Sequence, residues 1–98
     1  MFEIIITDVF EDWISALRDD RAVARIRTRL DRLALGNFGD SKTVGGGVSE
    51  LRIDYGPGYR LYYTLSERVI VVMLCGGDKT TQKLDIKAAQ AFAKQWRA

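Results

Sequence analysis

The chain has 98 residues, of which 47% are hydrophobic and 29% are charged, and its formal net charge is only +2. This length and composition indicate one globular domain, residues 1–98, with a single modest core rather than a disordered chain. Because the net charge is small, a nucleic-acid partner would have to be recognised through the placement of the charges rather than their sum.

Several kinds of site are excluded by the residue types that are missing. The sequence contains no histidine and a single cysteine, Cys75. A metal centre built on imidazole or thiolate ligands is therefore not expected, and a Ser–His or Cys–His nucleophile pair is impossible. No cofactor is implied. We expect no membrane span and no signal peptide, and hence a cytoplasmic protein in which Cys75 is a buried apolar residue.

The N-terminal third predicts a strand followed by two helices. Phe2–Ile6 is short and rich in β-branched residues, which is typical of a strand. We expect Asp8 to cap a helix over Val9–Arg18, and Asp19–Asp20 to cap a second helix. The predicted inner faces are Phe10, Trp13, Ile14 and Leu17 in the first helix and Val23, Ile26, Leu30 and Leu33 in the second. Together the two helices predict an antiparallel helical hairpin.

The outer face of the second helix carries four arginines at steps of four, four and three residues, which we call the arginine stripe: Arg21, Arg25, Arg29 and Arg32. Solvent-facing arginines are common on amphipathic helices, so an ordinary solvated surface is the simpler interpretation. The functional alternatives are that the arginine stripe binds phosphates or, as the second choice after a solvated surface, an acidic protein partner.

The middle of the chain predicts a loop and then a β-hairpin. Gly36–Gly47 contains five glycines and is expected to form a mobile loop. Two runs of alternating residues then flank Gly56–Gly58, which indicates an antiparallel hairpin. With these three residues as the loop, the expected cross-strand pairs are Tyr55 with Tyr59, Asp54 with Arg60, and Arg52 with Tyr62.

The hairpin predicted in this way has two different faces. One face is apolar, while the other carries Arg52, Arg60 and Tyr62 and would form an open floor for an anion. Alternatively, the two arginines pair with Glu50 and Asp54 across the sheet. The composition alone leaves these two interpretations balanced.

The C-terminal third predicts a strand and a last helix. Val69–Cys75 is apolar on both faces, as in a central strand. Thr80 or Thr81 is expected to cap a helix whose apolar stripe is Leu84, Ala88, Ala91, Phe92 and Trp96, and both Trp13 and Trp96 are predicted to be core residues. The predicted order is β-α-α-β-β-β-α, an α+β fold with helices on one side of a largely antiparallel sheet.

Three segments taken together resemble the RelE/ParE toxin superfamily of bacterial toxin–antitoxin modules. They are Ser49–Arg52, Gly58–Tyr63 and Leu74–Gln82, the last followed by Asp85 and Ile86. The resemblance extends over nearly the whole chain and is closest to the HigB-like branch, the addiction module killer proteins. It implies a RelE-like fold and an endoribonuclease that cuts messenger RNA, usually in the ribosomal A site. It also implies a DNA-binding antitoxin, encoded by the adjacent gene, that silences the toxin.

The same resemblance implies roles for particular residues. Arg60, the arginine of the Tyr-Arg motif, would contact the scissile phosphate, and Arg52 and Lys79 would be further catalytic cations. We assign Tyr62 and Lys42 to RNA binding. Members of the superfamily often carry a catalytic histidine or a C-terminal tyrosine, which this chain lacks, so the acid and the base do not transfer. A non-enzymatic, ParE-like inhibitor of DNA gyrase and an inactive relative that binds RNA or its antitoxin are the alternatives.

Overall fold

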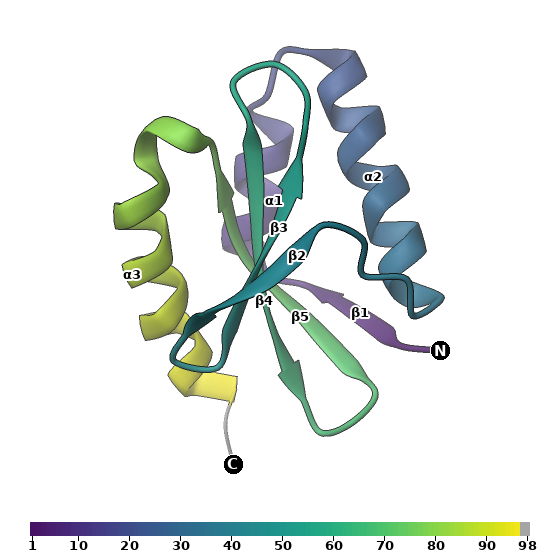
Figure 1. The fold of residues 1–98 in the computed structure, drawn as a ribbon, viewed down its shortest axis with the longest axis vertical. Coiled ribbons are helices and arrows are strands. Elements are labelled where there is room, and N and C mark those ends of the chain that lie inside the picture. The colour runs from purple at the N-terminus through teal and green to yellow at the C-terminus, as the bar shows by residue number, and fades with distance from the viewer. Residues whose placement is uncertain (97–98) are drawn as a thin grey trace.

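The computed structural model describes residues 1–96 and contains a five-stranded sheet with helices on both faces (Figure 1). The elements in chain order are β1 (Glu3–Ile6), α1 (Asp8–Ser15), α2 (Asp20–Ala34), β2 (Ser41–Gly45), β3 (Val48–Ile53), β4 (Tyr59–Ser66), β5 (Ile70–Gly77), the 3-10 turn η1 (Lys79–Thr81), α3 (Gln82–Ala93) and the 3-10 turn η2 (Lys94–Trp96). The strand order is β1-β5-β4-β3-β2, and only the pairing of β1 with β5 is parallel within this sheet. The α+β class is confirmed. No helix of the described residues has the length and apolar character needed to cross a membrane.

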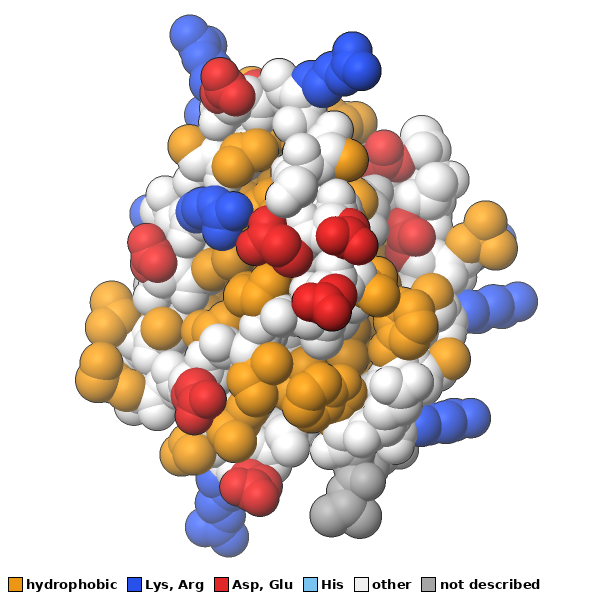
Figure 2. All heavy atoms as spheres, turned by 180° about the vertical axis from the view of Figure 1, so that it is seen from behind, with side chains coloured by type: hydrophobic (Ala, Val, Ile, Leu, Met, Phe, Trp, Pro, Cys, Tyr) orange, Lys and Arg blue, Asp and Glu red, His pale blue; other side chains and the backbone are white. Residues whose placement is uncertain are grey.

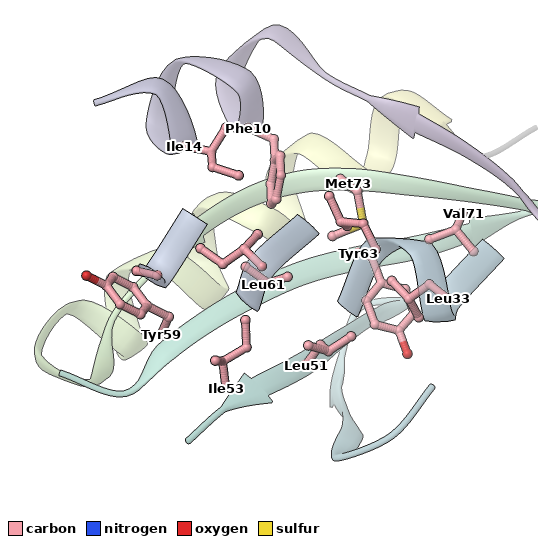
Figure 3. Packing of buried hydrophobic residues seen from close by; sticks show 13 residues of the cluster. Phe10, Ile14, Leu33, Leu51, Ile53, Tyr59, Leu61, Tyr63, Val71 and Met73 are labelled. Atoms are coloured by element: carbon pink, nitrogen blue, oxygen red, sulfur yellow. The ribbon is translucent and has the colours of Figure 1, made fainter. Parts of the chain in front are cut away.

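Each face of the sheet supports its own hydrophobic cluster. Between the sheet and helices α1 and α2, the cluster in Figure 3 includes Phe10, Ile14, Ile26, Leu33, Leu51, Leu61, Tyr63 and Met73. Between the sheet and α3, the cluster includes Val48, Tyr62, Val72, Leu74, Ala89 and Ala93. The expectation that all helices pack on one side is therefore wrong, because β4 and β5 are apolar on both faces and each face needs cover.

Side-chain caps define the starts of the first two helices. The Thr7 hydroxyl accepts a hydrogen bond of 3.2 Å from the Phe10 N–H, so Thr7 rather than Asp8 caps α1. The Asp19 carboxylate accepts from the backbone N–H of Arg21, as predicted for the cap of α2. The helices run in opposite directions (Figure 1), as expected of a helical hairpin.

Residues 41–45 form an edge strand where a mobile loop was predicted. In the antiparallel pairing of β2 with β3, Ser41 lies opposite Leu51 and Lys42 lies opposite Glu50. The glycines at positions 45, 46 and 47 all have positive φ, which allows a tight reversal between the two strands. The glycine run therefore marks the turn, and the preceding Ser-Lys-Thr-Val pairs as a strand.

The register of the β3–β4 hairpin differs by two residues from the predicted one. Ile53 lies opposite Tyr59 and Arg52 lies opposite Arg60, so the loop spans five residues, 54–58. A shift of two residues preserves the face on which each side chain lies. The division of the hairpin into two faces is therefore confirmed, whereas the predicted cross-strand pairs are wrong.

Contacts between Tyr55 and helix α2 explain the longer loop. The Tyr55 hydroxyl donates a hydrogen bond of 2.9 Å to the Asp19 carboxylate, and the Arg25 guanidinium lies 4.7 Å from the centre of the Tyr55 ring. The same hydrogen bond lowers the pKa of Asp19 and raises the pKa of Tyr55. Tyr55 is thus held by α2 and does not continue the strand.

Helix α3 presents a different face to the sheet from the predicted stripe. Ala89 and Ala93 are fully buried, whereas Leu84 is 72% exposed and Trp96 is 37% exposed. The prediction that Trp96 is a core residue is wrong, whereas Trp13 packs against the main core as predicted. Small residues at the contact allow the helix to approach a sheet face that already holds the large side chain of Tyr62.

Cys75 is buried in the hydrophobic cluster between the sheet and α3, in agreement with its predicted role as a small apolar residue. Burial raises the pKa of its thiol to about 12, so the group is protonated at neutral pH.

Two glycines at the end of β5 leave room for side chains on opposite faces of the sheet. A Cβ atom at Gly76 would overlap the indole ring of Trp13, and a Cβ atom at Gly77 would overlap the carboxylate of Asp85. Neither glycine has a positive φ, so the requirement at these positions is space rather than backbone conformation.

We therefore expect Gly76→Ala to destabilise the protein by about 1–3 kcal/mol, because the added methyl group overpacks the contact with Trp13. Chemical denaturation at equilibrium measures the free energy of unfolding. In a Trp13→Leu background the same substitution should destabilise much less. Equal destabilisation in both backgrounds would contradict the steric explanation.

Candidate functional site

A pocket of about 480 Å³ opens where the β3–β4 hairpin meets the loop after β5. The residues that line it are Asp40, Arg52, Ile53, Asp54, Gly56, Pro57, Gly58, Arg60 and Lys79. The three residues predicted to be catalytic, Arg52, Arg60 and Lys79, therefore lie in one pocket although they come from β3, β4 and η1.

Two arginines face each other directly across neighbouring strands in this pocket. Arg52 and Arg60 are cross-strand partners, an arrangement of like charges that is unfavourable unless counter-charges are present. Each guanidinium has its own carboxylate, since Arg52 lies 2.9 Å from Asp40 and Arg60 lies 3.7 Å from Glu50. Arg60 pairs with Glu50 rather than with its predicted opposite residue, Asp54.

The two ion pairs differ sharply in their exposure to solvent. The side chains of Arg52 and Asp40 are 38% and 57% exposed, whereas that of Arg60 is 12% exposed and that of Glu50 is fully buried. An exposed pair contributes only about 0–1 kcal/mol, so a bound anion can replace Asp40 on Arg52. The expectation that Arg60 lies on an open sheet face is wrong, because α3 covers that face.

Lys79 reaches the pocket because the chain turns sharply after β5. The Asp78 carboxylate accepts hydrogen bonds of 2.5 Å from the Thr80 hydroxyl and 2.8 Å from the Thr80 N–H, and these bonds lower the pKa of Asp78. The Lys79 N–H donates to the Pro57 carbonyl at 3.4 Å. This hydrogen bond joins the turn after β5 to the tip of the β3–β4 hairpin and places Lys79 beside Gly58.

The two residues assigned to RNA binding lie outside this pocket. Tyr62 is fully buried beneath α3, with its hydroxyl 3.5 Å from the Glu50 carboxylate. Burial and the charge of Glu50 raise the pKa of Tyr62, so the phenol remains protonated. The expectation of an open position for Tyr62 is wrong, and a direct contact with RNA has no structural support. Lys42 is exposed on the edge strand β2.

The arginine stripe is not a uniformly solvated surface. Arg29 donates a hydrogen bond of 2.7 Å to the Arg52 carbonyl, and burial lowers the pKa of Arg29. Arg25 is exposed but stacks on the ring of Tyr55, and Arg21 and Arg32 are also exposed. Two of the four arginines therefore support the hairpin that carries the pocket.

A second groove, of about 340 Å³, continues from the pocket along α2. It is lined by Ala24, Arg25, Thr28, Arg29, Arg32, Ile53 and Asp54, and the last two residues also line the pocket. The combined linings carry six cationic and two acidic side chains, a balance of +4, whereas the whole chain carries +2. Positive charge is thus concentrated in these two linings. Acidic side chains are grouped near the middle of the face seen in Figure 2.

Two residues of the site were not predicted. Asp40 precedes β2 in a segment that was expected to be a mobile loop, and nothing in the local sequence marks it as the partner of Arg52. Gln82 donates a hydrogen bond of 2.7 Å to the buried carboxylate of Glu50. The one indication in the sequence that Gln82 belongs to the site was its position in the Leu74–Gln82 segment.

The chemistry of the pocket suits a phosphate group. Guanidinium groups match the geometry of phosphate oxygens, and an ammonium group adds positive charge. The rim carboxylates of Asp40 and Asp54 can accept protons. Among residues 1–96 there is no group of three or more acidic or cysteine side chains that could hold a metal ion.

Comparison with known proteins places the chain in a family. Residues 12–96 match the family model described as Phage derived protein Gp49-like (DUF891). A protein of Haemophilus influenzae described as uncharacterized is 50% identical over 93 residues, which cover 95% of this chain and 94% of that protein. The chain belongs to the Gp49-like family, a RelE-like toxin family of addiction module killer proteins. The predicted superfamily is confirmed at this level, and the HigB-like assignment stays a prediction.

Because Asp40 forms an ion pair with Arg52 in the free protein, it competes with an incoming anion for this guanidinium. We therefore expect Asp40→Asn to strengthen the binding of a phosphate-rich ligand. Loss of a competing exposed pair of about 0.2–1 kcal/mol corresponds to an affinity gain of roughly 1.4- to 5-fold. Titration calorimetry with tripolyphosphate measures this affinity. Asp31→Asn, which makes the same charge change on the exposed side of α2, is the control. An equal gain in both variants would indicate net charge rather than release of Arg52.

Proposed function

We propose that this protein is the toxin of a type II toxin–antitoxin module. We further propose that it is a metal-independent endoribonuclease that cuts messenger RNA while the transcript is bound to the ribosome. Membership in a RelE-like toxin family supports the toxin role. The observation that carries the enzymatic part is the convergence of Arg52, Arg60 and Lys79 on one pocket. A phosphodiester is the ligand that this set of cations fits best.

Cleavage of RNA without a metal requires the ribose 2′-oxygen to attack the adjacent phosphorus. The bond from phosphorus to the 5′-oxygen breaks, and a 2′,3′-cyclic phosphate and a 5′-hydroxyl are formed. Negative charge develops on the phosphorane in the transition state, which cations stabilise most effectively when they are held in place beforehand. Arg60 and Arg52 suit this role, and Lys79 adds a third positive charge at the pocket wall.

Two protons must also move, one from the 2′-hydroxyl and one to the leaving 5′-oxygen. The carboxylates of Asp40 and Asp54 line the pocket and can receive the first, and the ammonium group of Lys79 can supply the second. Tyr62 is buried away from the pocket and is not a proton carrier in this scheme. If the ribosome orients the RNA, electrostatic stabilisation and weak acid–base groups suffice.

We expect expression of the chain without an antitoxin to arrest growth, with cuts inside coding regions found by primer-extension mapping. Lys79→Met and Arg52→Gln should each lower cleavage by about 10²–10³-fold, the usual effect of losing one contact to a developing oxyanion. Arg68→Gln and Lys87→Met remove exposed cations elsewhere and serve as matched controls. Intact transcripts together with gyrase-dependent DNA damage would instead assign the protein to the ParE-like alternative.

We further propose that a small DNA-binding antitoxin, encoded by the adjacent gene, docks on the arginine stripe and the groove beside it. The groove carries Arg25, Arg29 and Arg32 with one acidic residue, Asp54, so it favours an acidic segment. Because Arg25 and Arg29 support the hairpin, charge reversal at these positions would also disturb the pocket.

Charge reversal at Arg21 and Arg32, the other two members of the stripe, gives the cleaner test. We expect Arg21→Glu combined with Arg32→Glu to weaken the complex with the antitoxin, mainly through slower association, while RNA cleavage by the free toxin survives. Surface plasmon resonance at two salt concentrations measures the association rate. The double variant Arg68→Glu with Lys87→Glu carries the same charge change away from α2. Unchanged association of the Arg21/Arg32 variant would show that the stripe is ordinary solvated surface.

A further inference from the structure

The buried carboxylate of Glu50 lies next to the guanidinium of Arg60, 3.7 Å from its Nε atom. Glu50 is fully buried on the face of β3 that α3 covers. An ionised side chain in such a position is unfavourable unless charged and hydrogen-bonding partners surround it. The partners of Glu50 therefore have to be accounted for one by one.

Three side chains from two other elements surround the Glu50 carboxylate. Its Oε2 atom accepts a hydrogen bond of 2.7 Å from Gln82 Nε2, at the start of α3, and lies 3.5 Å from the Tyr62 hydroxyl of β4. Its Oε1 atom lies 3.7 Å from Arg60 Nε, and neither of these two atoms has a hydrogen-bond partner among the described residues. Gln82 thus makes the one short hydrogen bond that orients the carboxylate, and the carboxylate attracts Arg60 by charge.

The guanidinium of Arg60 lies between the Glu50 carboxylate and the hairpin loop. Its Nε edge faces Glu50, while a terminal nitrogen lies 3.4 Å from the Gly58 carbonyl at the hairpin loop, beside the pocket. A guanidinium is planar, so fixing the Nε edge also fixes the direction of the two terminal nitrogens. Those nitrogens are the donors that bind a phosphate in the usual two-point manner.

We propose that Gln82 and Glu50 are positioning residues for Arg60. Gln82 orients the Glu50 carboxylate, and Glu50 holds the Arg60 guanidinium so that its terminal nitrogens point at the pocket. The inference deepens the proposed endoribonuclease function, on which it rests, by naming the residues that align its phosphate-binding arginine. It also gives the Leu74–Gln82 segment a second role beside the placement of Lys79.

The test uses Gln82→Met, which keeps the length of the side chain and removes the donor. We expect kcat for RNA cleavage to fall by about 10- to 100-fold, with KM changed by less than about threefold, because a misdirected arginine weakens transition-state binding more than ground-state binding. Gln82→Asn, which keeps the amide but cannot reach Glu50, should behave in the same way. Denaturation curves check that both variants are folded.

Gln90→Met is the matched control. Gln90 lies on the same helix and donates a comparable hydrogen bond, of 3.2 Å, to the Val44 carbonyl of β2, away from Arg60. If Gln82 has a merely structural role, the Gln82 and Gln90 variants should lose stability and activity together. A rate loss confined to the Gln82 variants supports positioning.

A double-mutant cycle with Arg60→Lys decides whether the effect passes through Arg60. Lysine keeps the charge beside Glu50 but lacks the planar fork, so Gln82→Met should lower kcat by less than about twofold in this background. An equal loss in both backgrounds, or no loss in the parent background, would overturn the proposal.

A measurement without substrate separates this inference from the proposed function. In the ¹⁵N–¹H NMR spectrum, the Arg60 Nε–H should give a resonance that exchanges slowly with water, and Gln82→Met should accelerate that exchange at least tenfold while Gln90→Met does not. If the parent protein cleaves no RNA, the proposed function fails, and this resonance still decides the positioning role. An unchanged Arg60 resonance in the folded Gln82→Met variant would overturn it.

Discussion

The cationic end of the sheet is organised around the fully buried carboxylate of Glu50. Removing such a charge from water is unfavourable by several kcal/mol, so it persists only where the surrounding chain supplies a cation and hydrogen-bond donors. Arg60 supplies the charge, and Gln82 supplies the short hydrogen bond. These contacts join β3, β4 and the first turn of α3. They therefore also set where the loop after β5 must run, and this loop carries Lys79 to the pocket.

A second feature of the site follows from the direct pairing of two arginines across neighbouring strands. The repulsion between Arg52 and Arg60 is offset by two carboxylates of different character. The pair of Arg60 with Glu50 is largely buried, whereas the pair of Arg52 with Asp40 is exposed and can be replaced by another anion. The protein can thus hold a concentrated positive charge in its free state and still offer one guanidinium to an incoming phosphate. The hairpin loop keeps this geometry because α2 holds Tyr55.

Family membership and pocket chemistry support the proposed function from independent directions. The Gp49-like family is a RelE-like toxin family, and the pocket gathers the cations that a phosphodiester cleavage would need. A chain without histidine has to rely on preorganised charge more than on a strong base near neutral pH, and for that reason the alignment of Arg60 matters. The same positive surface suits an acidic antitoxin segment, so inhibition and catalysis would draw on one electrostatic feature.

Local features of the sequence were sufficient for much of the fold and for the set of pocket cations. Alternation identified the faces of the β3–β4 hairpin, the Asp19 cap marked the start of α2, and Arg52, Arg60 and Lys79 were found from motifs. Tertiary structure alone decided the hairpin register, the strand identity of residues 41–45, the buried face of α3, the low exposure of Arg60 and the burial of Tyr62. The reason is physical: alternation and capping involve neighbours in the chain, whereas register and burial depend on partners distant in sequence. Tyr55 bonds to Asp19, 36 residues away, and does not continue the strand. Arg60 pairs with Glu50, whose carboxylate accepts a hydrogen bond from Gln82.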